Sequence, residues 1–288
     1  MSILLALKVL MKESTCLRRY KHVKSFIEGK GEPEVAVVYC THGDETAGKK
    51  AVEKLLEEEQ PDLRKAVKFV FANEKAFQQG ERYVDTDLNR SFPGSAESNS
   101  HEERLAADMM EELQNIKVLD IHETSTSPVP FALFTWSDEE TVDTLRSAGV
   151  DSAVEISYTS GCGINHYGGV EVEVGPKKSE KAVNQAYKLL KDFLINQGVV
   201  KGETDYSSPE IYKVYGTVSK LEEDWMPVSE NFESVDEGDV IAERDSGRIV
   251  ADEDFVPILF SDTYSNILGF KAVRLEKVET SFYSQGED

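Results

Sequence analysis

The sequence predicts an α/β protein with a mostly parallel mixed sheet flanked by helices, followed by a small C-terminal all-β domain. Two observations carry this prediction. From Glu34 to Asn196, short runs of β-branched and apolar residues alternate with segments of helical periodicity, which is typical of an α/β domain. Beyond Gly198 the runs become short and alternating, and helical periodicity disappears. We therefore expect two domains, at residues 1–198 and 199–288.

The first strand is predicted at residues 34–40, where a continuous apolar run indicates a strand buried on both faces. It stops at a polar loop, residues 41–45, with the sequence THGDE. Small and apolar residues then recur every four positions as far as Leu55, and Pro61 ends this segment. The order is therefore strand, polar loop and helix.

The same patterns continue along the chain. Residues 74–100 are polar with little apolar periodicity, and a loop of that length inside a compact domain is usually functional. Ser100 and Glu103 match a capping box at the start of a helix. Further helices are predicted after Ser137 and Ser179, and strands at residues 66–72, 117–121, 131–136, 153–156, 169–174, 212–218, 239–242 and 248–251.

Charge and cysteine content limit the partners and the compartment. The chain has 32 Lys and Arg against 54 Asp and Glu, a net charge of −22, which repels nucleic acid and anionic membranes. The apolar run within residues 1–14 is too short and too interrupted to span a membrane. Cys16, Cys40 and Cys162 have no CxxC spacing, which predicts buried free thiols and a cytoplasmic location. We expect neither nucleic-acid nor membrane partners; a homo-oligomer is possible.

Three side chains at predicted strand ends form a candidate metal site. His42 and Glu45 follow the first strand at HxxE spacing, and His122 directly follows the strand predicted at residues 117–121. Two histidines and one glutamate commonly hold catalytic zinc, with a fourth position left for water. These residues can meet because open α/β sheets bind ligands at the carboxyl ends of their strands. An isolated HxxE pair usually does not bind a metal. Whether this pair does so is therefore judged from the other polar residues expected at the same sheet edge.

Other polar side chains suit recognition of a small acidic substrate. Arg82, Asn89 and Arg90 lie together in the long polar stretch, and guanidinium groups bind carboxylates well. Glu173 lies near the end of a strand rich in β-branched residues, where packing gives no reason for a charge.

Four phrases together resemble one family. HGDETAG at 42–48, RYVDTDLNR at 82–90, LDIHET at 119–124 and VEVEVGP at 170–176 resemble, in order and spacing, the succinylglutamate desuccinylase/aspartoacylase family, whose members are related to zinc carboxypeptidases. The resemblance implies one zinc ion per chain, held by His42, Glu45 and His122. It also implies hydrolysis of the amide bond of a small-molecule N-acyl amino acid.

The same resemblance implies roles for five further residues. Glu173 would be the general base toward a zinc-activated water and would return the proton to the leaving amine. Arg82 would polarise the scissile carbonyl and hold its oxyanion. Asn89 and Arg90 would bind the α-carboxylate of the amino acid, and Tyr264 would reach the substrate from the C-terminal domain.

Two departures from the family pattern concern the site. Asp44 stands where the family often has asparagine, and we expect it to orient His42. No arginine occurs between Arg146 and Arg244. Aspartoacylases resemble one another in having an arginine shortly before the glutamate of the VGP phrase, and that arginine binds the side-chain carboxylate of the substrate. A substrate less acidic than N-acetylaspartate is therefore expected.

Alternatives stay open on the sequence alone. A carboxypeptidase acting on short peptides would use the same ligands, and a non-catalytic zinc-binding protein could share the fold. Asp85 and Asp87, in the middle of the polar stretch, are explained as residues of a polar turn.

Overall fold

The structure is a computed structural model. It describes residues 22–59, 61–124, 130–135, 139–159, 163–204, 208–220, 224–262, 264 and 266–275. Several sequence predictions lie outside these residues: those on the N-terminal run at 1–14, Cys16, Trp136, Ser137 and Cys162. Cys40 is buried and free, as predicted. None of the helices among the described residues is both long and apolar enough to cross a lipid bilayer.

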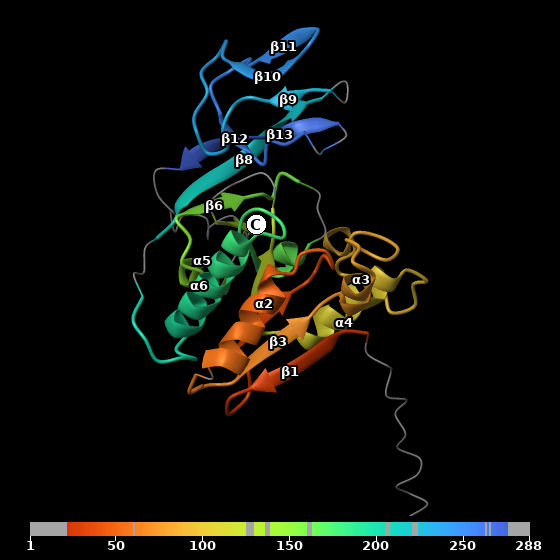
Figure 1. Cartoon of the computed structure of the whole chain (residues 1–288), viewed down its shortest axis with the longest axis vertical. Coiled ribbons are helices and arrows are strands. Elements are labelled where there is room, and N and C mark those ends of the chain that lie inside the picture. Colours follow the sequence, from red (N-terminus) through yellow and green to blue (C-terminus); the bar gives the residue numbers. More distant parts are fainter. Residues whose placement is uncertain are drawn as a thin grey trace, which may run out of the picture.

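A ten-stranded mixed sheet organises the molecule, in the order β1-β3-β2-β4-β7-β5-β6-β8-β13-β12 (Figure 1). Five neighbouring pairs are parallel, namely β2–β3, β2–β4, β4–β7, β5–β6 and β6–β8. The other four pairs are antiparallel. The predicted α/β class is confirmed. The strands are β1 Lys24–Glu28, β2 Val35–Tyr39, β3 Val67–Phe71, β4 Lys117–His122, β5 Phe131–Phe134, β6 Ser152–Glu155, β7 Val170–Glu173, β8 Glu210–Ser219, β12 Val256–Ile258 and β13 Ile267–Leu275.

Helices cover both faces of this sheet. α2 (Ala47–Glu53), which continues as a π-helical turn over Lys54–Glu59, packs beside α6 (Glu180–Asn196) on one face (Figure 1). α5 (Glu139–Ser147) contacts α6, and α4 (His101–Glu112) packs against the opposite face. Each of these helices begins within a few residues of the predicted position.

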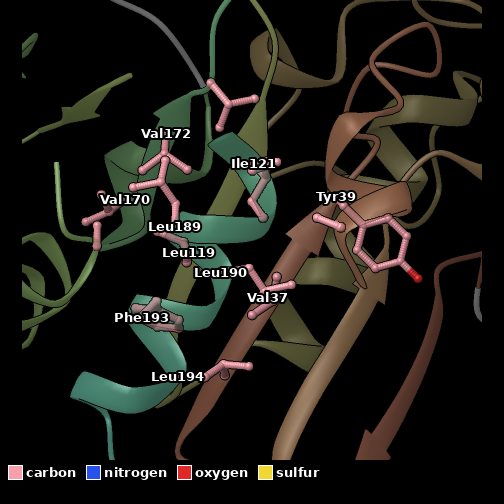
Figure 2. Close-up of a cluster of buried hydrophobic side chains, with 14 of the residues drawn as sticks. Val37, Tyr39, Leu119, Ile121, Val170, Val172, Leu189, Leu190, Phe193 and Leu194 are labelled. Atoms are coloured by element: carbon pink, nitrogen blue, oxygen red, sulfur yellow. The ribbon is translucent and has the colours of Figure 1, made fainter. Parts of the chain in front are cut away.

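Strand alternation explains why both faces of β2 are buried. Val37 points toward α6 together with residues of neighbouring strands, and Figure 2 shows these side chains around Leu190 and Phe193 of the helix. Ala36 and Val38 point the other way, into the core that α4 closes. Because full burial of one aliphatic or aromatic side chain contributes about 1.5–3 kcal/mol, these two cores hold the strand ends of the site in place.

The C-terminal part extends the main sheet and adds a second one. β8 pairs in parallel with β6, and β13 and β12 follow it. β9 (Met226–Pro227), β10 (Val240–Arg244) and β11 (Gly247–Val250) form a separate antiparallel sheet, in which β10 and β11 correspond to the strands predicted at 239–242 and 248–251. The described part of this region contains no helix. The main sheet thus crosses residue 198, and the two-domain division stays a prediction.

One helix was missed because it is short. The sequence predicts a loop over residues 74–100, but α3 (Glu74–Gln79) occupies its start. Asn73 caps this helix, its Oδ1 accepting a hydrogen bond from the Ala76 amide at 3.1 Å, and Gly80 ends it at φ +71°. Six residues are too few for helical periodicity to stand out from a polar background.

Candidate active site

Charged side chains alternate with apolar ones on two neighbouring strands. Asp120 and His122 on β4 lie opposite Glu171 and Glu173 on β7 in the parallel register. Because side chains of a strand alternate between faces, all four point to the α4 side of the sheet. Their apolar neighbours face the α6 core shown in Figure 2: Leu119, Ile121, Val170 and Val172. The site is therefore built into the strand pattern itself.

The three predicted metal ligands converge. His42 Nδ1 lies 3.0 Å from Glu45 Oε1, and His122 Nδ1 lies 3.2 Å from Glu45 Oε2. One nitrogen or oxygen from each residue lies within 4.8 Å of the others, and each residue is at most 3% exposed. The loop after β2 and the end of β4 meet because β2 and β4 are parallel neighbours.

Two carboxylates orient the histidines toward Glu45. His42 Nε2 lies 3.0 Å from Asp87 Oδ1, and His122 Nε2 lies 2.9 Å from Asp120 Oδ2. This leaves both Nδ1 atoms facing the centre, the arrangement in which a carboxylate fixes the ring of a zinc-binding histidine. The donor set, its burial and its orientation fit zinc.

The pKa values of the buried histidines and glutamates are shifted because their charges lie close together. Burial lowers the pKa of His42 and His122, but the neighbouring carboxylates Glu45 and Asp120 outweigh it and hold both pKa values above the ordinary value. Burial raises the pKa of Glu171 and Glu173 to about 7, and the carboxylates around them add to the effect. A cation bound among these carboxylates would balance their charge.

Arg82 reaches the same centre from the polar loop. Its Nη1 donates to Glu45 Oε1 at 3.1 Å, and its Nη2 donates to Asp87 Oδ2 at 3.1 Å. Its side chain is 40% exposed, so the guanidinium lies between the buried cluster and solvent. Asn89 is buried and Arg90 is exposed, with Arg90 Nη1 donating to the Asn89 carbonyl at 2.7 Å. The structure therefore brings Arg82 into contact with the predicted ligand Glu45, while Asn89 is bonded through its backbone amide to Asp87, the partner of His42.

Glu102 of α4 organises the loop that carries Arg82, Asn89 and Arg90. Its carboxylate is fully buried and accepts four hydrogen bonds, from Asn73 Nδ2 and from the amides of Val84, Asp85 and Thr86. Although burial opposes the charged form, these bonds hold the pKa of Glu102 below its ordinary value. The predicted capping box differs in its chemistry. Ser100 makes no side-chain cap, and Asp85 Oδ2 accepts from the His101 amide instead at 2.7 Å.

Replacing Glu102 with alanine is expected to lower the free energy of unfolding by about 3 kcal/mol or more, since several buried donors lose their acceptor. Urea denaturation measures this change, and the KM for substrate is expected to rise with it. Glu103→Ala, one residue along the same helix and partly exposed, is the control. Equal destabilisation by both variants would contradict the organising role of Glu102.

Tyr264 lies between β12 and β13 and packs partly buried against the core between these strands and β5. Burial raises the pKa of its phenol to about 12, and the charges of Glu173, Arg90 and Arg82 also act on it. The buried Lys220 donates to the carbonyls of Asp262, at 2.7 Å, and Tyr264, at 3.0 Å, and so holds this segment. The phenol of Tyr264 is thus near enough to Glu173, Arg90 and Arg82 for their charges to act on it.

One expectation for an acidic residue was wrong, and another was incomplete. Asp44 does not contact His42; its Oδ2 pairs with Lys177 Nζ at 3.1 Å. Asp87 fills the expected position beside His42 and is more than a turn residue, although its Oδ1 also accepts from the Asn89 amide at 2.9 Å. The sequence gives no signal for Asp87, which is 45 positions from His42. Asp120 could have been found, because it precedes His122 by two positions on an otherwise apolar strand.

Comparison with known proteins identifies the family. A family model described as the succinylglutamate desuccinylase/aspartoacylase catalytic domain matches residues 32–182. The chain belongs to the succinylglutamate desuccinylase/aspartoacylase family. The match includes every candidate site residue except Tyr264.

Curated relatives in this family are succinylglutamate desuccinylases. The one from Pseudomonas fluorescens strain Pf-5 is 32% identical over 132 residues, which is 39% of this chain and 39% of the relative. That of Pseudomonas aeruginosa strain PAO1 is 30% identical over 132 residues, covering 39% and 40% of the two chains. The matched part therefore spans about two fifths of the length of these relatives.

Two solved structures have the same fold as this chain. The ectoine utilization protein EutE (DoeB) from Ruegeria pomeroyi superposes with a TM-score of 0.67 at 21% identity, over 87% of each chain. Murine aminoacylase 3 superposes with a TM-score of 0.64 at 19% identity, over 85% of this chain and 98% of the other. At these identities the likeness establishes the fold of this desuccinylase/aspartoacylase family member, including its C-terminal strands.

Proposed function

We propose that this protein is a zinc-dependent hydrolase that cleaves the amide bond of an N-acyl amino acid. Membership of a family of amide-hydrolysing deacylases supports this activity. The observation that carries the proposal is the convergence of His42, Glu45 and His122, with Arg82 and Glu173 beside them. Bound by these three ligands, zinc would act as a Lewis acid and lower the pKa of a bound water to about 7.

Glu173 is suited to the proton transfers of amide hydrolysis. Its carboxyl group faces the cluster, its buried Oε2 has no hydrogen-bond partner, and its pKa lies near 7. A carboxyl group with a pKa near neutrality can accept the proton of the attacking water and donate it to the leaving nitrogen. We assign the general base and acid to this residue.

Arg82, Asn89, Arg90 and Tyr264 would bind and polarise the substrate. The Arg82 guanidinium borders the metal ligands and can donate to the oxygen on which charge develops. Arg90 is exposed beside Asn89, and together they offer donors to the α-carboxylate of the amino acid. Tyr264 would close the opposite side of the pocket. A small-molecule substrate is the proposed partner, while a homo-oligomer and a cytoplasmic location stay predictions.

A screen of N-acyl amino acids with detection of the released amine tests this function. The purified protein is assayed as isolated, after chelation, and after chelation and return of zinc. Turnover that is lost on chelation and restored by zinc is the expected result. Hydrolysis of dipeptides without hydrolysis of N-acyl amino acids would replace the proposal with a carboxypeptidase. Bound zinc without turnover of either class would make the protein a non-catalytic zinc-binding member of the fold.

A further inference from the structure

Two buried oxygen acceptors lie beside the metal cluster without a hydrogen-bond partner. Glu171 is 4% exposed and Asn89 is 7% exposed, yet Glu171 Oε1 and Asn89 Oδ1 accept no hydrogen bond. An unpaired acceptor at such depth costs about 1–3 kcal/mol, and more for a charged group. Buried polar groups of this kind are usually satisfied by a partner, here one absent from the folded chain.

The two side chains converge on one point at Gly163. A β-carbon built on this glycine would lie 2.8 Å from Glu171 Oε1 and 3.4 Å from Asn89 Cγ. The Asn165 Oδ1 atom, 3.1 Å from the same position, is already bonded to His166 Nδ1 at 2.7 Å. A side chain at position 163 would clash with the Glu171 carboxylate, so glycine is what allows Glu171 and Asn89 to come together here.

No basic side chain of the described residues is bonded to Glu171. Residues 147–176 contain neither lysine nor arginine. The nearby cations bond elsewhere: Arg82 to Glu45 and Asp87, Lys177 to Asp44 and Glu45. Arg90 and His122 act on Glu171 only through their charge. The missing partner is thus a hydrogen-bond donor, and a positive charge suits a carboxylate acceptor.

A second metal ion fits this place less well. Asp120, His122 and Glu171 also lie close enough to share an ion. However, His122 Nε2 already contacts Asp120 Oδ2, and both Asp120 oxygens accept from Thr41 Oγ1 at 3.0 and 2.8 Å. Glu171 alone among them has an unpaired oxygen, so a single organic donor accounts for the geometry better.

We propose that Glu171 and Asn89 form a subsite for an ammonium group, and that the substrate is an N-acylated diamino acid with its second amine free. This inference rests on the proposed function, because it places the side chain of the substrate beside the reacting amide. Glu171 and Glu173 are two positions apart on β7, or about 7 Å along the strand. A side chain of three or four methylenes spans that distance. Asn89 Nδ2 is still available to the α-carboxylate.

Matched substrates test the subsite in the zinc-loaded protein. Nα-acetylornithine carries the amine, Nα-acetylnorvaline has the same carbon chain without it, and Nα-acetylglutamate carries a carboxylate. We expect kcat/KM for the ornithine compound to exceed that for the norvaline compound by about tenfold to hundredfold, as for a hydrogen bond to a charged group. The glutamate compound is expected to be the poorest of the three.

Glu171→Gln, which keeps the shape of the side chain, is expected to bring the ornithine-to-norvaline ratio close to one. Asp44→Asn is the control, since it removes the same unit of charge near the site but not from the subsite; it should keep the ratio. A ratio that Glu171→Gln does not change, or a preference for norvaline or glutamate in the parent protein, would overturn the proposal while leaving the deacylase function standing.

Calorimetric titration separates failure of the subsite from failure of the function. Ornithine and norvaline, the free amino acids, are titrated into the zinc-loaded protein and into Glu171→Gln with its zinc content checked. Tighter binding of ornithine, lost in the variant, supports the subsite even if no N-acyl compound is hydrolysed. Equal or weaker binding of ornithine in the parent protein overturns it.

Discussion

Replacing Glu173 with glutamine is expected to lower kcat by about 10²–10⁴, the usual contribution of a positioned general acid or base. Glutamine has nearly the same shape but cannot accept the proton of the attacking water. Because Glu173 is not among the converging ligands, zinc content and the thermal midpoint of unfolding should stay close to the parent values. The base assignment therefore predicts a loss of turnover in a folded, zinc-bound protein.

Steady-state kinetics with metal analysis on the same preparation measures this effect. Glu155→Gln is a matched control: this glutamate also ends a strand of the sheet and is buried, but it only accepts from the Ser157 amide at 2.9 Å. It should keep most of the turnover. If the Glu173→Gln variant keeps more than about a tenth of the parent kcat, the role of general base belongs to another group.

Removing the metal is expected to abolish turnover and to make stability fall as pH rises. In the metal-free protein the pKa values of Glu171 and Glu173 lie near 7, above the ordinary value of 4.5. A carboxyl group with a raised pKa stabilises the fold below its unfolded pKa, and this contribution is lost as pH rises through the folded value. The raised pKa values of His42 and His122 act in the same direction.

Thermal unfolding at pH 5 and pH 8, with chelator or with zinc, measures this dependence. We expect the chelated protein to lose about 2 kcal/mol between these pH values, or roughly 4–8 °C in the unfolding midpoint. Zinc should restore stability at pH 8, because a ligand that binds only the folded state stabilises it. Glu171→Gln should reduce the pH dependence. A chelated protein that is fully active would refute the metal assignment, and one that is more stable at pH 8 than at pH 5 would refute the raised pKa values.

Much of the site could be predicted because its residues interrupt strong patterns. His42 and Glu45 follow a continuous apolar strand, and His122 ends another, so their place at one sheet edge follows from parallel pairing. Asp87 could not be found, since its role depends on a loop that Glu102 folds through backbone amides. Sequence periodicity contains no trace of such long-range contacts.

For the fold, too, features set by neighbouring residues could be predicted, and contacts between distant segments could not. Alternation predicted β8, β10 and β11, and apolar runs predicted the central strands, because each pattern is a property of neighbouring residues. The strands β9, β12 and β13 were not predicted. The pairing of β8 with β6 joins two segments whose patterns differ, and nothing in either pattern specifies its partner. Lys220 gives the same lesson. Nothing around it in the sequence indicates that it is buried and bonded to the backbone at Tyr264, which only the fold shows.

The β6–β8 pairing also limits how the C-terminal strands can move. Residues Ser152 to Glu155 pair with Glu210 to Lys213, and β8 in turn pairs along its length with β13. The C-terminal strands cannot swing away as a rigid body without breaking this ladder. The backbone at Asp262 and Tyr264 is held separately, by the side chain of Lys220. Any rearrangement around Tyr264 that the proposed substrate requires would therefore be local, and would not be a swing of the C-terminal strands.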